Sequence, residues 1–297
     1  MINLKMIKAH MNRKIGHFRR IPFQTTCGLL FLFNRYRTTD AYLMGFPKTG
    51  NSWLRFMIGS YIQLVCNLDQ PPLFESFDLF GRCEKPPIGP SMIASHGPLE
   101  WSSQERTDLN QRNVVSHYIN KKVVLLVRHP LDTMVSGWFH AKSTGFDGNF
   151  FRGGLEDFLN DPVFGLDKFF RFYQIWKDER HRFNNLILVR YEDTRKAPIR
   201  QLERILHFLE LPIISPYVEK TVKQSSFKQM QKLEMKENLK TEGKISKTLF
   251  NYSGNNNSDS FRVRKGKVGG YRDYLTNDIW CRYEDRVAHE MPHWYGY

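Results

Sequence analysis

The sequence contains only four cysteines, Cys27, Cys66, Cys83 and Cys281, and they lie far apart. Zinc and iron–sulfur sites need cysteines or histidines at short, fixed spacings, and these four do not show such a spacing. Scattered cysteines are typical of free thiols in a reducing compartment. The sequence therefore predicts a protein without a metal site and with a cytoplasmic location.

Long hydrophobic runs are also missing. A helix that crosses a bilayer needs about 18 consecutive apolar residues. The apolar run at residues 27–33 has only seven, and no small-residue cleavage site follows it. We expect neither a transmembrane segment nor a secretory signal, whereas the acid-free, basic residues 1–24 leave a transit peptide open as an alternative.

Positive charges exceed negative charges by 14, and the excess is concentrated in two segments. Residues 1–40 contain eight Lys and Arg against one acid, and residues 223–267 contain eleven against four. Such segments can serve an anionic small ligand, a membrane surface or nucleic acid. We interpret residues 1–38 as a basic N-terminal extension and residues 39–297 as one domain.

Short apolar runs alternate with helical patterns along this domain. Strands are expected at residues 41–46, 91–95, 122–127 and 186–189. Helices are expected at residues 53–64, 132–139, 155–159, 168–183, 199–209 and 278–289. Unbroken apolar runs such as Val123 to Val127 are typical of parallel strands that are covered on both faces. The alternation predicts an α/β fold, a three-layer sandwich around a central and mostly parallel sheet.

Each expected strand is followed by a side chain that can take part in chemistry. These side chains are Lys48, His96, Arg128 and Tyr191. Ligands of open parallel sheets bind beyond the carboxyl ends of the strands. We therefore expect these four residues to lie near one site.

The turn after the first strand, at residues 47–50, is the clearest local signal. Backbone N–H groups at the start of a helix, together with the charge of Lys48, favour an anion such as phosphate or sulfate. The Gly-Lys-Ser/Thr ending of the Walker motif is absent from the chain, which argues against a phosphate-loop NTPase. The alternative is a surface lysine in an ordinary turn between a strand and a helix.

Three other groups have a functional and a purely structural interpretation. Arg128 and Ser136 could grip one phosphate, or Arg128 could form a salt bridge with Asp132. His96 could accept a proton near neutral pH, or it could be one structural histidine among ten. The Arg-Lys-Gly triplet at residues 264–266 could approach a ligand closely, or it could be a solvated charged segment.

Taken together, these segments resemble the sulfotransferases of the cytosolic type, which use 3′-phosphoadenosine 5′-phosphosulfate (PAPS). Residues 47–53, Pro-Lys-Thr-Gly-Asn-Ser-Trp, are similar to the family's phosphosulfate loop Pro-Lys-Ser-Gly-Thr-Thr-Trp. Residues 128–136 resemble its 3′-phosphate motif Arg-Asn-Pro-x-Asp-x-x-x-Ser, and residues 94–98 resemble its catalytic segment Lys-Thr-His-x-Pro. Further matches are Tyr-Glu-Asp at 191–193, Ser-Ser-Phe-Lys-Gln-Met at 225–230 and Arg-Lys-Gly at 264–266. The six motifs occur in the family's order.

The resemblance implies a P-loop-like phosphosulfate site and a role for each matched residue. The 5′-phosphosulfate would lie at Lys48, Thr49, Gly50, Asn51 and Ser52. The 3′-phosphate would lie at Arg128, Ser136, Arg264, Lys265 and Gly266. The adenine would lie against Trp53, Phe227, Tyr191 and Ser225. His96 would take the proton of the acceptor as it attacks sulfur in line, Lys48 would neutralise charge on the leaving oxygen, and no metal would be required.

The sequence also departs from the family's motifs. Asn51 and Ser52 replace two threonines, His129 replaces an asparagine, Ala94 replaces the lysine near the catalytic histidine, and Tyr271 replaces a tryptophan. The dimer motif of the animal enzymes is not recognisable. The expected acceptor loops, at residues 69–90 and 140–165, match no motif and are rich in Phe, which predicts an aromatic acceptor pocket.

These observations predict a PAPS-dependent sulfotransferase that acts on a hydroxyl, or as a second choice an amine, of a small molecule. We expect no nucleic-acid partner. One alternative is a carbohydrate or protein sulfotransferase. The other is a non-catalytic protein that binds nucleotides or nucleic acid through its basic N-terminus and stacking aromatic residues.

Overall fold

The computed structural model describes residues 39–72, 86–97, 115–143, 151–240 and 265–297. The predicted basic extension, Cys27, Cys83, Arg264 and parts of both expected acceptor loops lie outside these residues. Cys66 and Cys281 are free thiols, as the sequence predicted. Within the described residues, no helix is long and apolar enough to cross a membrane.

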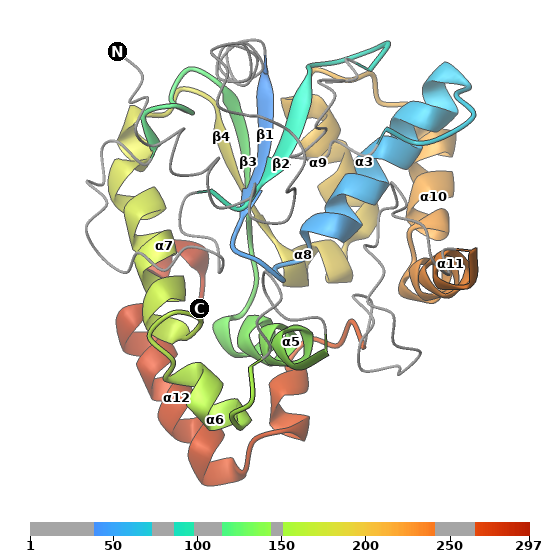
Figure 1. Cartoon of the computed structure of the whole chain (residues 1–297). Helices are drawn as coiled ribbons and strands as arrows, with labels where there is room; N and C mark the ends of the chain where they lie inside the picture. Colours follow the sequence, from blue (N-terminus) through green and yellow to red (C-terminus); the bar gives the residue numbers. More distant parts are fainter. Residues whose placement is uncertain (1–38, 73–85, 98–114, 144–150, 241–264) are drawn as a thin grey trace, which may run out of the picture.

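Four parallel strands form the central sheet in the order β2-β1-β3-β4 (Figure 1). They are β1 (Ala41–Gly45), β2 (Met92–Ser95), β3 (Lys122–Val127) and β4 (Leu186–Arg190). The register places Leu43 between Ala94 on one neighbouring strand and Val124 on the other. Each of the four expected strands is present, and their parallel pairing is confirmed.

Helices cover both faces of this sheet (Figure 1). One face packs against α3 (Asn51–Cys66), α9 (Pro198–Phe208) and α10 (Ser215–Gln224). The other packs against α5 (Pro130–Ser143), α7 (Leu166–Glu179) and α12 (Asn277–Glu290). Alternate residues of β3 belong to the two hydrophobic clusters, as the two-residue period of a strand requires. The predicted three-layer α/β sandwich is confirmed.

The remaining elements are three further helices and three 3₁₀ turns. They are α6 (Leu155–Leu159), α8 (Tyr191–Lys196), α11 (Phe227–Lys240) and the 3₁₀ turns η1 (Arg180–Arg182), η3 (Gly270–Asp273) and η4 (His293–Tyr295). Three helices, α8, α10 and α11, were not predicted. In α10 only Val218 and Thr221 are buried, so its sequence carries little of the apolar periodicity that identifies a helix. The predicted start of α5 at Asp132 was two residues late, because Pro130 takes the first helical position.

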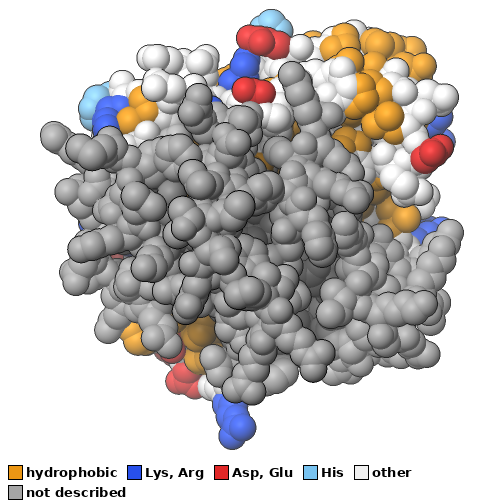
Figure 2. Space-filling model, turned by 45° about the horizontal axis from the view of Figure 1, so that its top comes forward, with side chains coloured by type: hydrophobic (Ala, Val, Ile, Leu, Met, Phe, Trp, Pro, Cys, Tyr) orange, Lys and Arg blue, Asp and Glu red, His pale blue; other side chains and the backbone are white. Residues whose placement is uncertain are grey.

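The buried apolar side chains form these two large clusters and a small one around Met230. Hydrophobic groups gather in one corner of the surface that Figure 2 shows. The exposed large hydrophobic residues among those described are Ile199, Ile213, Ile214 and Val268. Of these four, Val268 lies in the loop that precedes η3, beside the strand ends considered next.

Candidate active site

The carboxyl ends of the four strands bring the expected residues to one edge of the sheet. Across the sheet order the residues at or after the strand ends are His96, Lys48, Arg128 and Tyr191. Because all the pairings are parallel, these ends face the same way. The structure thus places at neighbouring strand ends four residues that are far apart in the sequence.

The turn between β1 and α3 has an unusual backbone. Lys48 has φ 70° and Gly50 has φ 106°, so two of three successive residues lie in the left-handed region. Such backbone is typical of turns that curve around an anion. A Cβ on Gly50 would lie only 2.7 Å from Cδ2 of Tyr191. Glycine is therefore required both for the left-handed backbone and for the close approach of the Tyr191 ring.

The polar side chains of this turn differ in what they contact. The Thr49 hydroxyl donates to the carbonyl of Phe46 at 2.7 Å and is fully buried, so its proton stabilises the turn. Asn51 is buried at the start of α3, and its Oδ1 accepts no hydrogen bond from the described residues. Ser52 is half-buried on the same first turn. The N–H groups of this turn lie at the positive end of α3.

Arg128 is held over the ring of Tyr191 and beside two loops. Its Cζ lies 4.5 Å from the Tyr191 ring centroid. Its Nη1 donates to the Lys48 carbonyl and its Nη2 to the Lys267 carbonyl, each at 3.4 Å. Both hydrogen bonds are long, and the buried Nε has no hydrogen-bond partner among the described residues. A guanidinium with donors left over at this position suits an anion with several oxygens.

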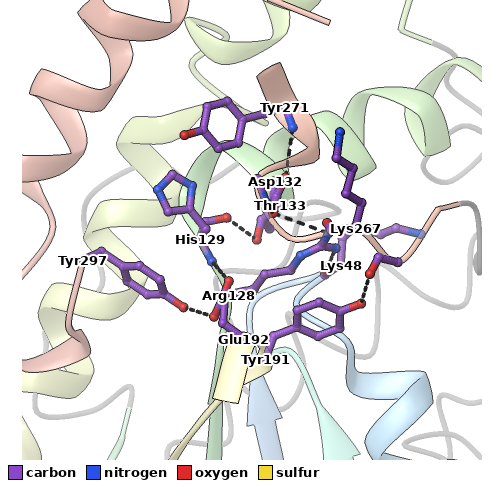
Figure 3. A network of polar contacts seen from close by, with 12 residues as sticks. Lys48, Arg128, His129, Asp132, Thr133, Tyr191, Glu192, Lys267, Tyr271 and Tyr297 are labelled. Carbon is purple, nitrogen blue, oxygen red and sulfur yellow. Dashed lines mark hydrogen bonds and ion pairs between the residues drawn. The ribbon is translucent and has the colours of Figure 1, made fainter. Parts of the chain in front are cut away.

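The salt bridge that was the structural alternative for Arg128 is also present. Its Nη2 lies 3.9 Å from Oδ2 of Asp132, near the limit for an ion pair. The stronger contacts of Asp132 go to the backbone N–H groups of Gly269 and Tyr271, at 2.8 and 3.0 Å. Asp132 therefore mainly fixes the loop before η3 over the start of α5 (Figure 3).

This loop carries Lys265 and Gly266, two of the predicted donor-binding residues. Gly266 has φ 60°, and a Cβ there would lie 2.4 Å from Cδ2 of Phe227. Lys265 pairs with Asp273 at 3.7 Å, and Lys267 pairs with the same carboxylate at 2.7 Å. The hydrogen bond from Lys267 and the two lysine charges lower the pKa of Asp273. The Lys265 side chain is half-exposed, and its ammonium has donors that a phosphate could use beside this weak ion pair.

Trp53 brings together the aromatic residues expected to hold a base. Its Nε1 donates to the Ser225 carbonyl at 2.7 Å, and its ring meets Tyr191 edge-on at 5.4 Å. Arg195, which was not predicted, has its guanidinium 5.8 Å from the indole. Ser225 directly follows α10, and its hydroxyl donates to the Thr221 carbonyl of that helix. The contact of Ser225 with Trp53 is therefore made by its backbone carbonyl.

His96 lies one residue beyond β2, next to the end of β1. Its Nδ1 is 2.8 Å from the Gly45 carbonyl. A carbonyl oxygen can only accept a hydrogen bond, so Nδ1 is the donor, and a neutral ring then carries its lone pair on Nε2. The main chain of β1 thus orients the ring. Ser136, which was predicted to bind a phosphate together with Arg128, is half-buried in the second turn of α5.

Tyr173 on α7 makes hydrogen bonds to the backbone at the ends of β1 and β3, and the sequence analysis did not identify it. Its hydroxyl donates to the Leu126 carbonyl at 2.8 Å and accepts from the Phe46 N–H at 3.4 Å. It therefore ties the end of β1 to the end of β3. Complete burial raises its pKa, which keeps the phenol protonated. No local pattern identifies such a residue, since it looks like one more aromatic residue on a core-facing helix.

Known proteins share both this sequence pattern and this architecture. A family model described as the sulfotransferase domain matches residues 38–294. Sulfotransferase 2A6 of Mus musculus is 27% identical over 249 residues, covering 80% of this chain and 79% of that protein. The amine sulfotransferase of Oryctolagus cuniculus is 24% identical over 267 residues, covering 86% and 81%. Cytosolic sulfotransferase 15 of Arabidopsis thaliana is 26% identical over 265 residues, covering 80% and 67%.

Two solved structures show the same fold. A mouse sulfotransferase complexed with PAP has a TM-score of 0.57 at 19% identity, covering 88% of this chain and 87% of that chain. Retinol dehydratase in complex with retinol and PAP has a TM-score of 0.57 at 16% identity, covering 88% and 85%. Because the family model spans most of the sequence, the chain belongs to the sulfotransferase domain family.

Proposed function

We propose that this enzyme sulfates a hydroxyl group of a small, largely apolar molecule, with His96 as the general base. The observation that carries the proposal is the contact between Nδ1 of His96 and the Gly45 carbonyl. It fixes the tautomer in which Nε2 can accept a proton, and it does so beside the turn that contains Lys48. A positioned base of this kind contributes about 10²–10⁴-fold to a rate.

The residues at the strand ends fit the donor. When bound, PAPS supplies the sulfuryl group together with a leaving group that carries the negative charge away. Lys48 and the N–H groups at the start of α3 hold the 5′-phosphosulfate, with Asn51 and Ser52 beside them. Arg128 holds the 3′-phosphate, and its unpartnered buried Nε and long hydrogen bonds support that role. Two cationic groups at separate strand ends match the two anionic ends of this donor.

Further predicted residues complete the donor site. We expect Ser136, Lys265 and Gly266 to bind the 3′-phosphate together with Arg128, and Arg264 remains a prediction from the sequence. Trp53 and Phe227 bind the adenine, with Tyr191 and the backbone of Ser225 at its edge. Lys48 also places a positive charge where negative charge develops during transfer, which is the electrostatic contribution that oriented cations make.

The proposed apolar character of the acceptor rests on the Phe-rich acceptor loops of the sequence, and the residues packed next to His96 are apolar as well. Gly97 is buried, and a Cβ there would lie 3.6 Å from both the Met44 sulfur and the Phe172 ring. Phe46 meets Phe172 edge-on at 5.7 Å behind them. Phe46 and Phe172 are almost fully buried, so they form the apolar core next to His96 and leave no exposed surface for an acceptor. The Phe-rich acceptor loops that the sequence predicts support a phenol or an apolar alcohol. Retinol in one structural relative is an alcohol of this kind, and the relative named amine sulfotransferase keeps amines as the second acceptor class. As in the relatives named cytosolic, we place the reaction in the cytoplasm.

The experiment that tests the acceptor class uses PAPS labelled with sulfur-35. The enzyme is incubated with phenols, apolar alcohols, amines, simple sugars, a polysaccharide and a protein mixture, and labelled products are separated. We expect label in a phenol or an apolar alcohol, with amines slower. Transfer only to the polysaccharide or to protein would refute the small-molecule assignment and support the alternative sulfotransferase class.

A further inference from the structure

Residues 295–297 pack against the end of β4 and take no part in the proposed chemistry. Nη2 of Arg190 donates to the Gly296 carbonyl at 2.9 Å. The Arg190 guanidinium also lies 4.6 Å from the ring centroid of Tyr297. Tyr295 is fully buried, and its hydroxyl donates to the Tyr173 carbonyl at 2.7 Å. The segment is therefore anchored at two points, one on the sheet and one on α7.

Glu192 connects this segment to the strand end that carries Arg128. Its Oε2 accepts a hydrogen bond from the Tyr297 hydroxyl at 2.5 Å, and its Oε1 accepts one from the backbone N–H of His129 at 2.8 Å (Figure 3). Burial, followed by the Glu192 charge, raises the pKa of Tyr297, so the phenol remains a donor at neutral and alkaline pH. The two carboxylate oxygens of Glu192 thus connect the Tyr297 hydroxyl to the backbone of His129.

The hydrogen bonds of Glu192 can affect the position of Arg128 in two ways. His129 follows Arg128 directly, so the bond to its N–H fixes the backbone that carries the guanidinium. Glu192 follows Tyr191 directly, and the Tyr191 ring lies under the same guanidinium at 4.5 Å. The His129 ring also meets Tyr297 edge-on at 5.4 Å. Releasing Glu192 therefore loosens both the chain that bears Arg128 and the ring on which it rests.

We propose that Tyr297 is a positioning residue for the 3′-phosphate site, acting through Glu192 on the backbone of His129 and so on Arg128. The proposal rests on the proposed binding of the 3′-phosphate by Arg128. Hydrogen bonds to charged groups are stronger than those between neutral groups. Removing the Tyr297 hydroxyl therefore leaves Glu192, and through it Arg128, less firmly positioned. The Tyr297 ring itself is held by Arg190 and stays in place when only its hydroxyl is removed.

The test compares two ligands that differ in one phosphate, PAP and adenosine 5′-monophosphate. Their affinities are measured by calorimetry on the full-length wild type and on the full-length variants Tyr297→Phe, Arg128→Ala and Tyr61→Phe. Tyr61→Phe is the matched control, because its phenol also donates a 2.5 Å hydrogen bond, to the Pro212 carbonyl, about three turns into α3. Thermal melting of each variant measures the stability that it loses.

We expect Tyr297→Phe to weaken PAP binding by about fivefold to tenfold and to leave adenosine 5′-monophosphate binding nearly unchanged. In turnover, KM for PAPS rises while kcat is kept, because a ground-state contact has been loosened. Tyr61→Phe loses stability but keeps the preference for PAP. In a Glu192→Ala background, Tyr297→Phe has no further effect, since the connection is already broken.

The two possible failures are distinguishable. If Arg128→Ala keeps the preference for PAP, the proposed 3′-phosphate site is wrong. If Arg128→Ala loses that preference while Tyr297→Phe keeps it, as Tyr61→Phe does, then Tyr297 serves stability alone and the inference about it is refuted.

Discussion

Replacing Gly266 with alanine is the most informative single change in the donor site. At φ 60° the backbone is left-handed, which costs a residue with a Cβ about 1–2 kcal/mol. The new Cβ would also lie 2.4 Å from Cδ2 and 2.7 Å from Cε2 of Phe227, and such overpacking costs about 1–3 kcal/mol more. The loop relieves this contact by moving away from Phe227.

That movement separates the residues proposed to hold the adenine from those proposed to hold the 3′-phosphate. Arg128 would lose the Lys267 carbonyl that now holds it at 3.4 Å. Because this hydrogen bond is long, its loss is worth about 0.5–1.5 kcal/mol, so we expect PAP binding to weaken by about twofold to tenfold. The assay is calorimetric titration of PAP, with thermal melting alongside it.

Gly89→Ala is a matched control for this variant. Gly89 has φ 78°, and a Cβ there would lie 2.6 Å from Cδ2 of Leu211, so its strain and its clash are of the same kind. Gly89 precedes β2 and so lies toward the other edge of the sheet from the site. The two variants should lose similar stability, but only Gly266→Ala should lose affinity. Equal PAP affinities in both variants would refute the assigned role of the loop.

Two further predictions concern stability. Asp132→Ala leaves the N–H groups of Gly269 and Tyr271 without their acceptor, so it should lower the free energy of unfolding by about 1–3 kcal/mol per group and weaken PAP binding; a melting curve and a PAP affinity like the wild type's would contradict this. Burial, then the charge of Lys121, lowers the pKa of His117 below 6.5. The unfolded chain therefore binds more protons, so stability falls as pH drops below about 6.5, and His117→Gln should flatten that loss in melting temperatures recorded from pH 8 to 5. Parallel pH curves for the two proteins would refute the role of His117.

The sheet could be predicted because its strands are local signals. Val123 to Val127 and Leu186 to Val189 read as covered parallel strands from their own residues. Once the strands are parallel, the meeting of His96, Lys48 and Arg128 at one edge follows from the geometry of the fold. The turn at Lys48 was also local, since a strand, a turn and a helix are contiguous there.

Other parts of the site depend on contacts between distant segments. Tyr173 and Leu126, or Tyr297 and Glu192, meet only after the layers have assembled, and nothing near either residue in the sequence marks the pair. α11 was missed for a related reason, because its sequence is mostly polar and gives little amphipathic pattern. Arg264 stays a prediction, since it lies outside the described residues.

The central claim is that His96 removes the acceptor's proton beside a donor that other residues hold. The most direct test is the rate of sulfur-35 transfer at saturating PAPS by the wild type and by His96→Ala, with PAP affinity measured on both proteins. The claim predicts a rate lower by about 10²–10⁴-fold and a PAP affinity that is nearly unchanged. A His96→Ala enzyme that binds PAP normally and transfers sulfate at a rate close to that of the wild type would contradict it.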